Sequence, residues 1–147
     1  MDTFLYFGYA SNLDVNTLEG RVQTAPKLLG TAVLPHFGFR FNYQNPDGSA
    51  RANVIASQNE SVYGLLFEIS EADRGYFLQS EPGYDFIEIE VLTKLGPKKA
   101  FTFISPKITK GIFPNKAYLD TIIKGGQTNQ IPKGYLASII NRAGSFI

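Results

Sequence analysis

Two pairs of neighbouring extended segments constrain the fold of this chain more than any other feature. In the first pair, Arg51–Ser57 and Ser61–Glu68 are separated by three polar residues. In the second, Tyr84–Leu95 and Lys99–Ser105 are joined at Gly96-Pro97. Extended segments with such short connections are typical of β-hairpins, whose strands are antiparallel. The chain is therefore expected to form a mainly antiparallel or mixed sheet, not a doubly wound parallel one.

Shorter segments complete the expected architecture. Thr3–Gly8 reads as a buried strand, and 28–41 as extended stretches broken at Pro35. Short helices are expected at 14–21, 70–79, 116–124 and 132–142, the third ending at Gly125-Gly126. The predicted fold class is α+β: a small, mixed, mostly antiparallel sheet, partly closed into a barrel, with short flanking helices. With 147 residues, positions 1–147 fit one domain.

The side chains that are missing narrow the possible chemistry. The chain has no Cys and one His, His36, which removes thiol nucleophiles, thiolate metal sites and sites built on several histidines. Carboxylates, hydroxyls, amines and backbone dipoles remain. We expect neither a cofactor nor a metal.

Charge and hydropathy bound the expected partners. The formal net charge is +1, which gives no electrostatic reason to expect nucleic acid. No apolar run approaches membrane-spanning length and no secretory leader is visible. We therefore expect a cytoplasmic protein, a monomer or homodimer, whose partner is a small molecule.

The segment Tyr6-Phe7-Gly8-Tyr9-Ala10-Ser11-Asn12-Leu13 is the strongest candidate for a binding element. A strand that ends in small residues and enters a helix presents free backbone N–H groups, which suit an anion. The same pattern also fits a tight strand-to-helix turn capped by Asn12, with no ligand. From spacing alone both interpretations stay open.

Motifs along the whole chain resemble the γ-glutamylcyclotransferase-like superfamily, which includes AIG2-like plant proteins and a cyclotransferase of butirosin biosynthesis. The N-terminal segment resembles its Tyr-Gly-Ser-Asn-Leu signature, although Ala10 stands where the superfamily has Gly. The matching elements that follow, in order, are Arg21, Val62–Ile69, Glu81 with Gly83-Tyr84, and the tail residues Tyr118, Gly125-Gly126, Pro132 and Tyr135.

The resemblance implies a reaction without a protein nucleophile. In the superfamily, the α-amine of a γ-glutamyl group attacks its own γ-carbonyl, so that 5-oxoproline forms and the attached amine leaves. By position, the resemblance implies Glu81 as general acid/base. It also implies a binding set that holds the substrate, namely the turn Tyr9, Ala10, Ser11, Asn12 and Leu13, with Tyr84 and Tyr118.

Several alternatives remain at this stage. Apolar neighbours at Phe77, Leu78 and Pro82 would favour the neutral form of the Glu81 carboxyl, but a solvated loop glutamate is the commoner case. Glu68 is a second candidate acid/base. Arg40 and Arg51 are read as surface ion pairs rather than substrate ligands. A binding domain of the same fold without turnover is the alternative function, suggested by Ala10 and by Pro82 ahead of Gly83.

Overall fold

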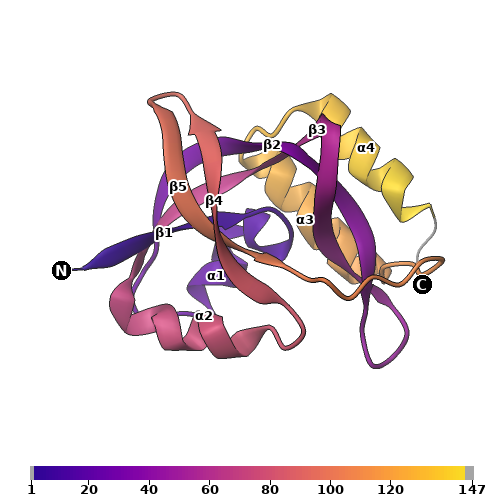
Figure 1. Cartoon of the computed structure of the whole chain (residues 1–147), viewed down its shortest axis with the longest axis horizontal. Helices are drawn as coiled ribbons and strands as arrows, with labels where there is room; N and C mark the ends of the chain where they lie inside the picture. Colours follow the sequence, from indigo (N-terminus) through magenta and orange to yellow (C-terminus); the bar gives the residue numbers. More distant parts are fainter. Residues whose placement is uncertain (1, 145–147) are drawn as a thin grey trace.

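The computed structural model describes residues 2–144, which form a closed five-stranded barrel in the order β1-β3-β2-β4-β5 (Figure 1). All neighbouring strands are antiparallel except β1 and β5, which close the barrel in parallel through Tyr6 and Phe101. The predicted mixed, mostly antiparallel α+β barrel is therefore confirmed. The strands are β1 (Thr3–Gly8), β2 (Lys27–Gln44), β3 (Ala50–Ser70), β4 (Asp85–Thr93) and β5 (Gly96–Ile104).

The prediction of a hairpin between 51–57 and 61–68 is wrong. Both segments belong to one strand, β3, which pairs with β2 from Lys27↔Glu68 to Gln44↔Ala50. The hairpin turn lies instead at 45–49, where Asn45 and Ser49 share a backbone hydrogen bond of 2.8 Å. The polar stretch at 58–60 stays within β3 although it has no paired residue in β2, because pairing continues on both sides of it, at Phe37↔Ala56 and Pro35↔Ser61.

The predicted break at Pro35 is a bulge in a continuous strand. The register of β2 against β3 shifts between Pro35 and Phe37, and His36 adopts a positive φ of 66° there. Proline has no N–H to donate to a sheet. At this bulge, residues 57–60 of β3 lie opposite His36, and pairing resumes beyond them at Phe37↔Ala56. The same strand therefore continues on both sides of Pro35.

The helices lie close to their predicted places, with one correction. α3 does not end at Gly125-Gly126 but runs through them to Thr128. A Cβ at Gly125 would lie 2.5 Å from the backbone of Leu13 and Asp14, so this glycine allows α3 to touch the N-terminal turn. The helical elements are η1 (Ser11–Leu13), α1 (Val15–Glu19), η2 (Glu71–Asp73), α2 (Arg74–Ser80), α3 (Lys116–Thr128) and α4 (Lys133–Ala143).

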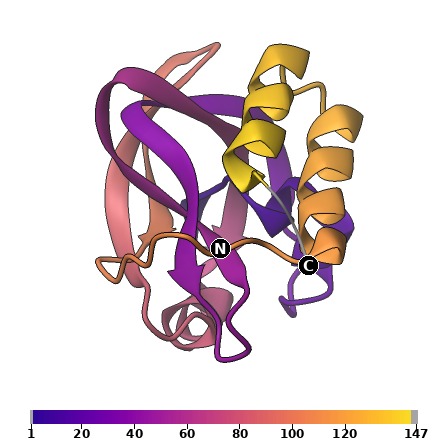
Figure 2. The same cartoon turned by 90° about the vertical axis from the view of Figure 1, so that its right-hand side faces the viewer.

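Two helical layers cover different sides of the barrel. α3 and α4 lie side by side along one side of it (Figure 2). On another side, Phe77 anchors α2 in an aromatic cluster with rings of β1, β4 and β5, among them Tyr6 at 4.9 Å and Phe86 at 5.7 Å between ring centroids. Burial of these rings fixes the C-terminal end of α2, and with it the position of Glu81, against the barrel.

No helix within residues 2–144 is both long and apolar enough to cross a membrane.

Candidate functional site

A small pocket forms where the end of β1, the start of β3, the turn after α2 and the helix α3 meet. Its cavity volume is about 40 Å³. Larger hollows of about 230, 340, 450 and 580 Å³ lie elsewhere, and the two largest are mainly apolar. Convergent polar groups, not size, single out the small pocket. Its lining comprises Tyr6, Tyr9, Ala10, Ser11, Asn12, Arg21, Arg51, Ala52, Glu81, Tyr84, Phe103 and Tyr118.

The N-terminal turn contributes its backbone to this pocket. Ala10 has a φ of −128°, so the position does not need the left-handed conformation that would favour glycine. Within residues 2–144, the backbone N–H groups of Ala10, Ser11 and Asn12 donate to no backbone carbonyl. These donors are available at the pocket wall, as the first N–H groups of a helical turn usually are.

Leu13 is placed differently from the rest of the turn. Its N–H donates to the carbonyl of Ala10 at 2.9 Å, and its side chain is fully buried in the core. Leu13 is therefore not among the residues that line the pocket.

Side chains of the turn organise a second layer behind these donors. The Asn12 amide nitrogen donates to the hydroxyl of Tyr6 at 2.8 Å, and its oxygen accepts from Arg21 at 3.1 Å. Tyr9 donates its hydroxyl proton to the carbonyl of Phe103 at 2.7 Å, and burial raises the pKa of that hydroxyl well above its ordinary value. Tyr9 is therefore a structural part of the wall, whereas Asn12 holds the guanidinium of Arg21 at the pocket.

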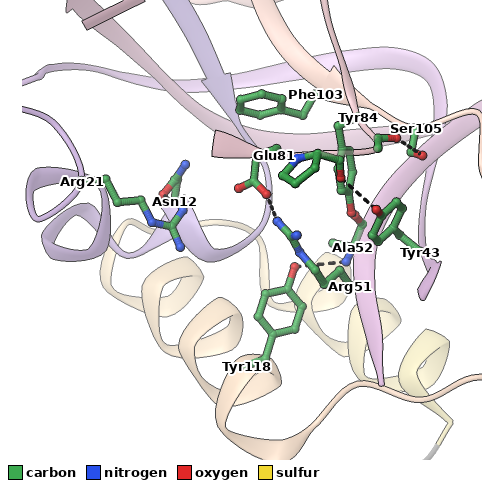
Figure 3. Close-up of polar contacts among 12 residues, drawn as sticks. Asn12, Arg21, Tyr43, Arg51, Ala52, Glu81, Tyr84, Phe103, Ser105 and Tyr118 are labelled. Atoms are coloured by element: carbon green, nitrogen blue, oxygen red, sulfur yellow. Dashed lines mark hydrogen bonds and ion pairs between the residues drawn. The ribbon is translucent and has the colours of Figure 1, made fainter. Parts of the chain in front are cut away.

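The turn that carries Glu81 is held by several hydrogen bonds. The hydroxyl of Tyr43 donates to the Pro82 carbonyl at 2.8 Å, and the hydroxyl of Ser105 donates to the Gly83 carbonyl at 2.6 Å (Figure 3). Gly83 has a φ of 89°, a conformation that glycine adopts without strain. Pro82 is accommodated in this turn, and the Glu81 side chain, 17% exposed, reaches the pocket.

Glu81 meets a guanidinium there, not the apolar wall expected from its sequence neighbours. Nη2 of Arg51 donates to Oε2 of Glu81 in an ion pair (Figure 3). Leu78, one of the expected apolar neighbours, is 61% exposed, and Phe77 points into the aromatic cluster. Oε1 of Glu81 accepts no hydrogen bond from residues 2–144.

Arg51 is the functional candidate that the sequence interpretation placed on the surface. Its guanidinium carbon lies 5.2 Å from the ring centre of Tyr84 and 5.8 Å from that of Tyr43. Burial alone would lower the pKa of Arg51, but the hydrogen bond and charge of Glu81 raise it above its ordinary value. The partner lies 30 residues away in sequence, so no local pattern announces the pair. Arg40, by contrast, forms the expected ion pair, with Glu60.

Tyr84 and Tyr118 both form hydrogen bonds with the backbone of Ala52, Tyr84 with its carbonyl and Tyr118 with its N–H. Tyr84 donates its proton to the Ala52 carbonyl at 2.5 Å, whereas Tyr118 accepts from the Ala52 N–H at 3.1 Å. The proton of Tyr118 has no acceptor among residues 2–144. Burial raises the pKa of Tyr118, which keeps that proton in place near neutral pH. Of these two tyrosines, Tyr118 alone keeps a proton to donate into the pocket.

The second acid/base candidate, Glu68, and other titratable side chains lie outside the pocket. Glu68 lines the apolar hollow of about 450 Å³ with Leu5 and Leu66. Glu88 and Glu90 are exposed on β4. The exposed His36 has its Nδ1 atom 3.1 Å from the carbonyl oxygen of Gln58. No group of three or more potential metal ligands occurs in the described part of the chain.

Comparison with solved structures identifies the architecture. A γ-glutamyl cyclotransferase has a TM-score of 0.86 and 20% identity, with 95% of this chain and 87% of that chain covered. The chain has the γ-glutamylcyclotransferase fold. An uncharacterised protein from Homo sapiens gives a TM-score of 0.85 and 21% identity, with 95% and 88% covered. A glutathione-specific γ-glutamyl cyclotransferase from yeast gives 0.65 and 13%, with 97% and 98% covered.

The likeness lies in the fold and not in the sequence. No protein-family model matches the sequence, and no curated protein does. The resemblance expected from the ordered motifs is confirmed as a shared γ-glutamylcyclotransferase fold. Because the identities are so low, the reaction and the role of each residue rest on the chemistry of the pocket itself.

Proposed function

We propose that this protein is a γ-glutamylcyclotransferase-type enzyme, with Glu81 as general acid/base. The observation that carries the proposal is that Glu81 and the donors of Ala10, Ser11 and Asn12 line one pocket. One oxygen of Glu81 is without a protein donor among residues 2–144. A base and a set of backbone N–H donors, which suit a carboxylate or an oxyanion, thus line the same small pocket.

The proposed reaction is an internal acyl transfer. The α-amine of a γ-glutamyl group attacks its γ-carbonyl carbon, the amide C–N bond breaks, and 5-oxoproline and an amine are released. Glu81 accepts a proton from the α-ammonium group and returns it to the leaving nitrogen, which can contribute about 10²- to 10⁴-fold in rate. The second proton that the attacking nitrogen loses on forming the lactam is also taken up by the leaving amine, which departs as an ammonium ion. The pocket holds the glutamyl chain in the folded geometry that the attack requires.

The remaining groups have separate tasks in this proposal. The free N–H groups of the turn bind the glutamyl α-carboxylate, with Arg21 behind them. The hydroxyl of Tyr118, whose proton has no acceptor among residues 2–144, donates to the oxyanion that develops on the γ-carbonyl oxygen. Tyr84 holds Ala52 in place and stacks near Arg51. No cofactor enters the reaction.

The ion pair between Arg51 and Glu81 favours a second candidate, a γ-glutamyl-binding domain without turnover. A substrate ammonium has to compete with the guanidinium for the carboxylate. Such competition weakens a base unless the substrate also gives Arg51 another partner. The two functions therefore differ in whether a bound ligand is converted.

Release of 5-oxoproline from a panel of γ-glutamyl dipeptides and γ-glutamyl amines tests the proposal. We expect release by the unaltered protein, a loss of at least about 100-fold in Glu81→Gln, and no loss in Glu68→Gln, which changes the rival carboxylate. If calorimetry shows that these compounds bind but no 5-oxoproline is released, the second candidate, a binding domain without turnover, would be supported. Full activity of Glu81→Gln would remove Glu81 from the mechanism.

A further inference from the structure

The charged groups of the pocket form an unusual set. Two arginines, Arg21 and Arg51, and one carboxylate, Glu81, line the same small volume. In Figure 3, Glu81 lies between the two guanidinium groups. Arg21 is held by the neutral oxygen of Asn12, whereas Arg51 is held by Glu81 itself. The pocket therefore offers two positive charges and one negative charge.

Arg51 has donors that the protein does not use. Only Nη2 donates within residues 2–144, and it does so to Glu81. Arg40 uses both of its terminal nitrogens, since Nη1 donates to Phe39 and Glu60 and Nη2 donates to Glu60. The Arg51 side chain is 29% exposed at the pocket, and the rings of Tyr43 and Tyr84 flank it. It is an oriented, accessible guanidinium suited to bidentate binding of a carboxylate.

The charge pattern matches one class of γ-glutamyl compound. A γ-glutamyl group brings one carboxylate and one ammonium. When the leaving amine is a free amino acid, a second carboxylate is added next to the scissile nitrogen. Two anions and one cation on the substrate then complement two cations and one anion in the pocket. A leaving amine without a carboxylate leaves Arg51 with no partner except Glu81.

We propose that Arg51 selects the leaving group, by binding the carboxylate of an amino acid attached to the γ-glutamyl group. This inference rests on the proposed function. Binding exchanges one ion pair for two: Arg51 moves to the substrate carboxylate, and Glu81 is left to the substrate ammonium. Arg51 thus couples recognition of the leaving group to release of the base.

Two nearly isosteric substrates test this role, γ-glutamyl-alanine and γ-glutamyl-alaninamide, which differ in one carboxylate. For the unaltered protein, we expect kcat/KM to favour γ-glutamyl-alanine by about 10- to 100-fold, since a charge-assisted contact is lost with the amide. Arg51→Gln should abolish the preference, chiefly by lowering kcat/KM for γ-glutamyl-alanine. Arg51→Lys should keep part of it. Arg142→Gln, which removes a guanidinium outside the pocket, should keep all of it.

Each other outcome has a definite meaning. An equal loss on both substrates in Arg51→Gln would overturn the proposal, because Arg51 would then bind the glutamyl part common to both or serve only the fold. A gain on both would also overturn it, with Arg51 acting only as a restraint on Glu81. If neither substrate is converted, the proposed function fails, and calorimetric affinities of the same two compounds for the unaltered protein and Arg51→Gln still decide whether Arg51 reads the carboxylate.

Discussion

Two glutamates of this barrel, Glu60 and Glu81, are each paired with an arginine but are used in different ways. Glu60 accepts four hydrogen bonds, two from Arg40 and one each from Ser57 and Arg142, at 2.5–3.0 Å. Among the described residues, Glu81 accepts a hydrogen bond only from Arg51. The first carboxylate ties β2, β3 and α4 together, whereas the second keeps an oxygen directed at a pocket.

The difference teaches how to separate structural from chemical carboxylates in this fold. A carboxylate whose oxygens are all bonded by fixed protein donors is stabilised as an anion and gives little access to a substrate. Accordingly, Arg40 and Ser57 lower the pKa of Glu60 to about 2. A carboxylate with a single partner and a free oxygen can exchange that partner for a ligand. An ion pair alone therefore does not mark a residue as structural.

The largest expected effect comes from replacing each of the two glutamates by glutamine and comparing the two variants. Glu81→Gln should lower the rate of 5-oxoproline release by about 10²- to 10⁴-fold, with a change of less than about 1 kcal/mol in the free energy of unfolding. Glu60→Gln should leave the rate within roughly twofold and cost about 1 kcal/mol of stability. Steady-state assays and urea unfolding measure both quantities. Comparable activity losses in the two variants would break the comparison.

The same distinction, between groups that are fully hydrogen-bonded within the protein and groups that keep a free donor or acceptor, applies to two tyrosines. Their replacement gives the next largest expected effect. Tyr118→Phe and Tyr84→Phe each remove one hydrogen bond to the backbone of Ala52, so both should destabilise the protein by about 1 kcal/mol. Only Tyr118→Phe also removes a proton available to an oxyanion. It should lower kcat by a further 10- to 100-fold or so.

The matched stability loss makes Tyr84→Phe the control for the fold. If both variants lost activity equally, positioning of Ala52 and not proton donation would account for the effect. If Tyr118→Phe kept full kcat, the oxyanion donors would have to be sought in the backbone of the turn alone.

How far the sequence predicted this molecule depended on how local each feature is. The barrel class followed from short-range strand patterns, and single polar residues cap two of the helical elements, Asp14 at α1 and Ser70 at η2. The extent of β3 did not, because pairing with β2 on both sides of the polar stretch makes one strand of the two segments. Gly125-Gly126 were read as a helix end because the close contacts of Gly125 with the N-terminal turn and of Gly126 with Leu136 are invisible in a local pattern.

The candidate site shows the same limit. Its two walls, the N-terminal turn and Glu81, were identified because each resembles a motif. Arg51 was not, because its role arises from a partner brought near by the α2–β4 turn. Leu13 was included because it belongs to the motif, although its N–H is bonded within η1. Motifs thus indicate which segments meet, whereas the fold decides which atoms remain free.

The smallest expected effect is the pH dependence of the Glu60 cluster. Because the pKa of Glu60 is about 2 in the folded protein, below its ordinary value of 4.5, its contribution to stability is present above about pH 4.5. That contribution is lost as the pH falls towards 2. Urea unfolding of the unaltered protein and Glu60→Gln at pH values from 6 to 3 should show a difference of about 1 kcal/mol that shrinks as the solution is acidified. A difference independent of pH would mean that Glu60 stabilises the protein through packing, and the contrast with Glu81 would then rest on reactivity alone.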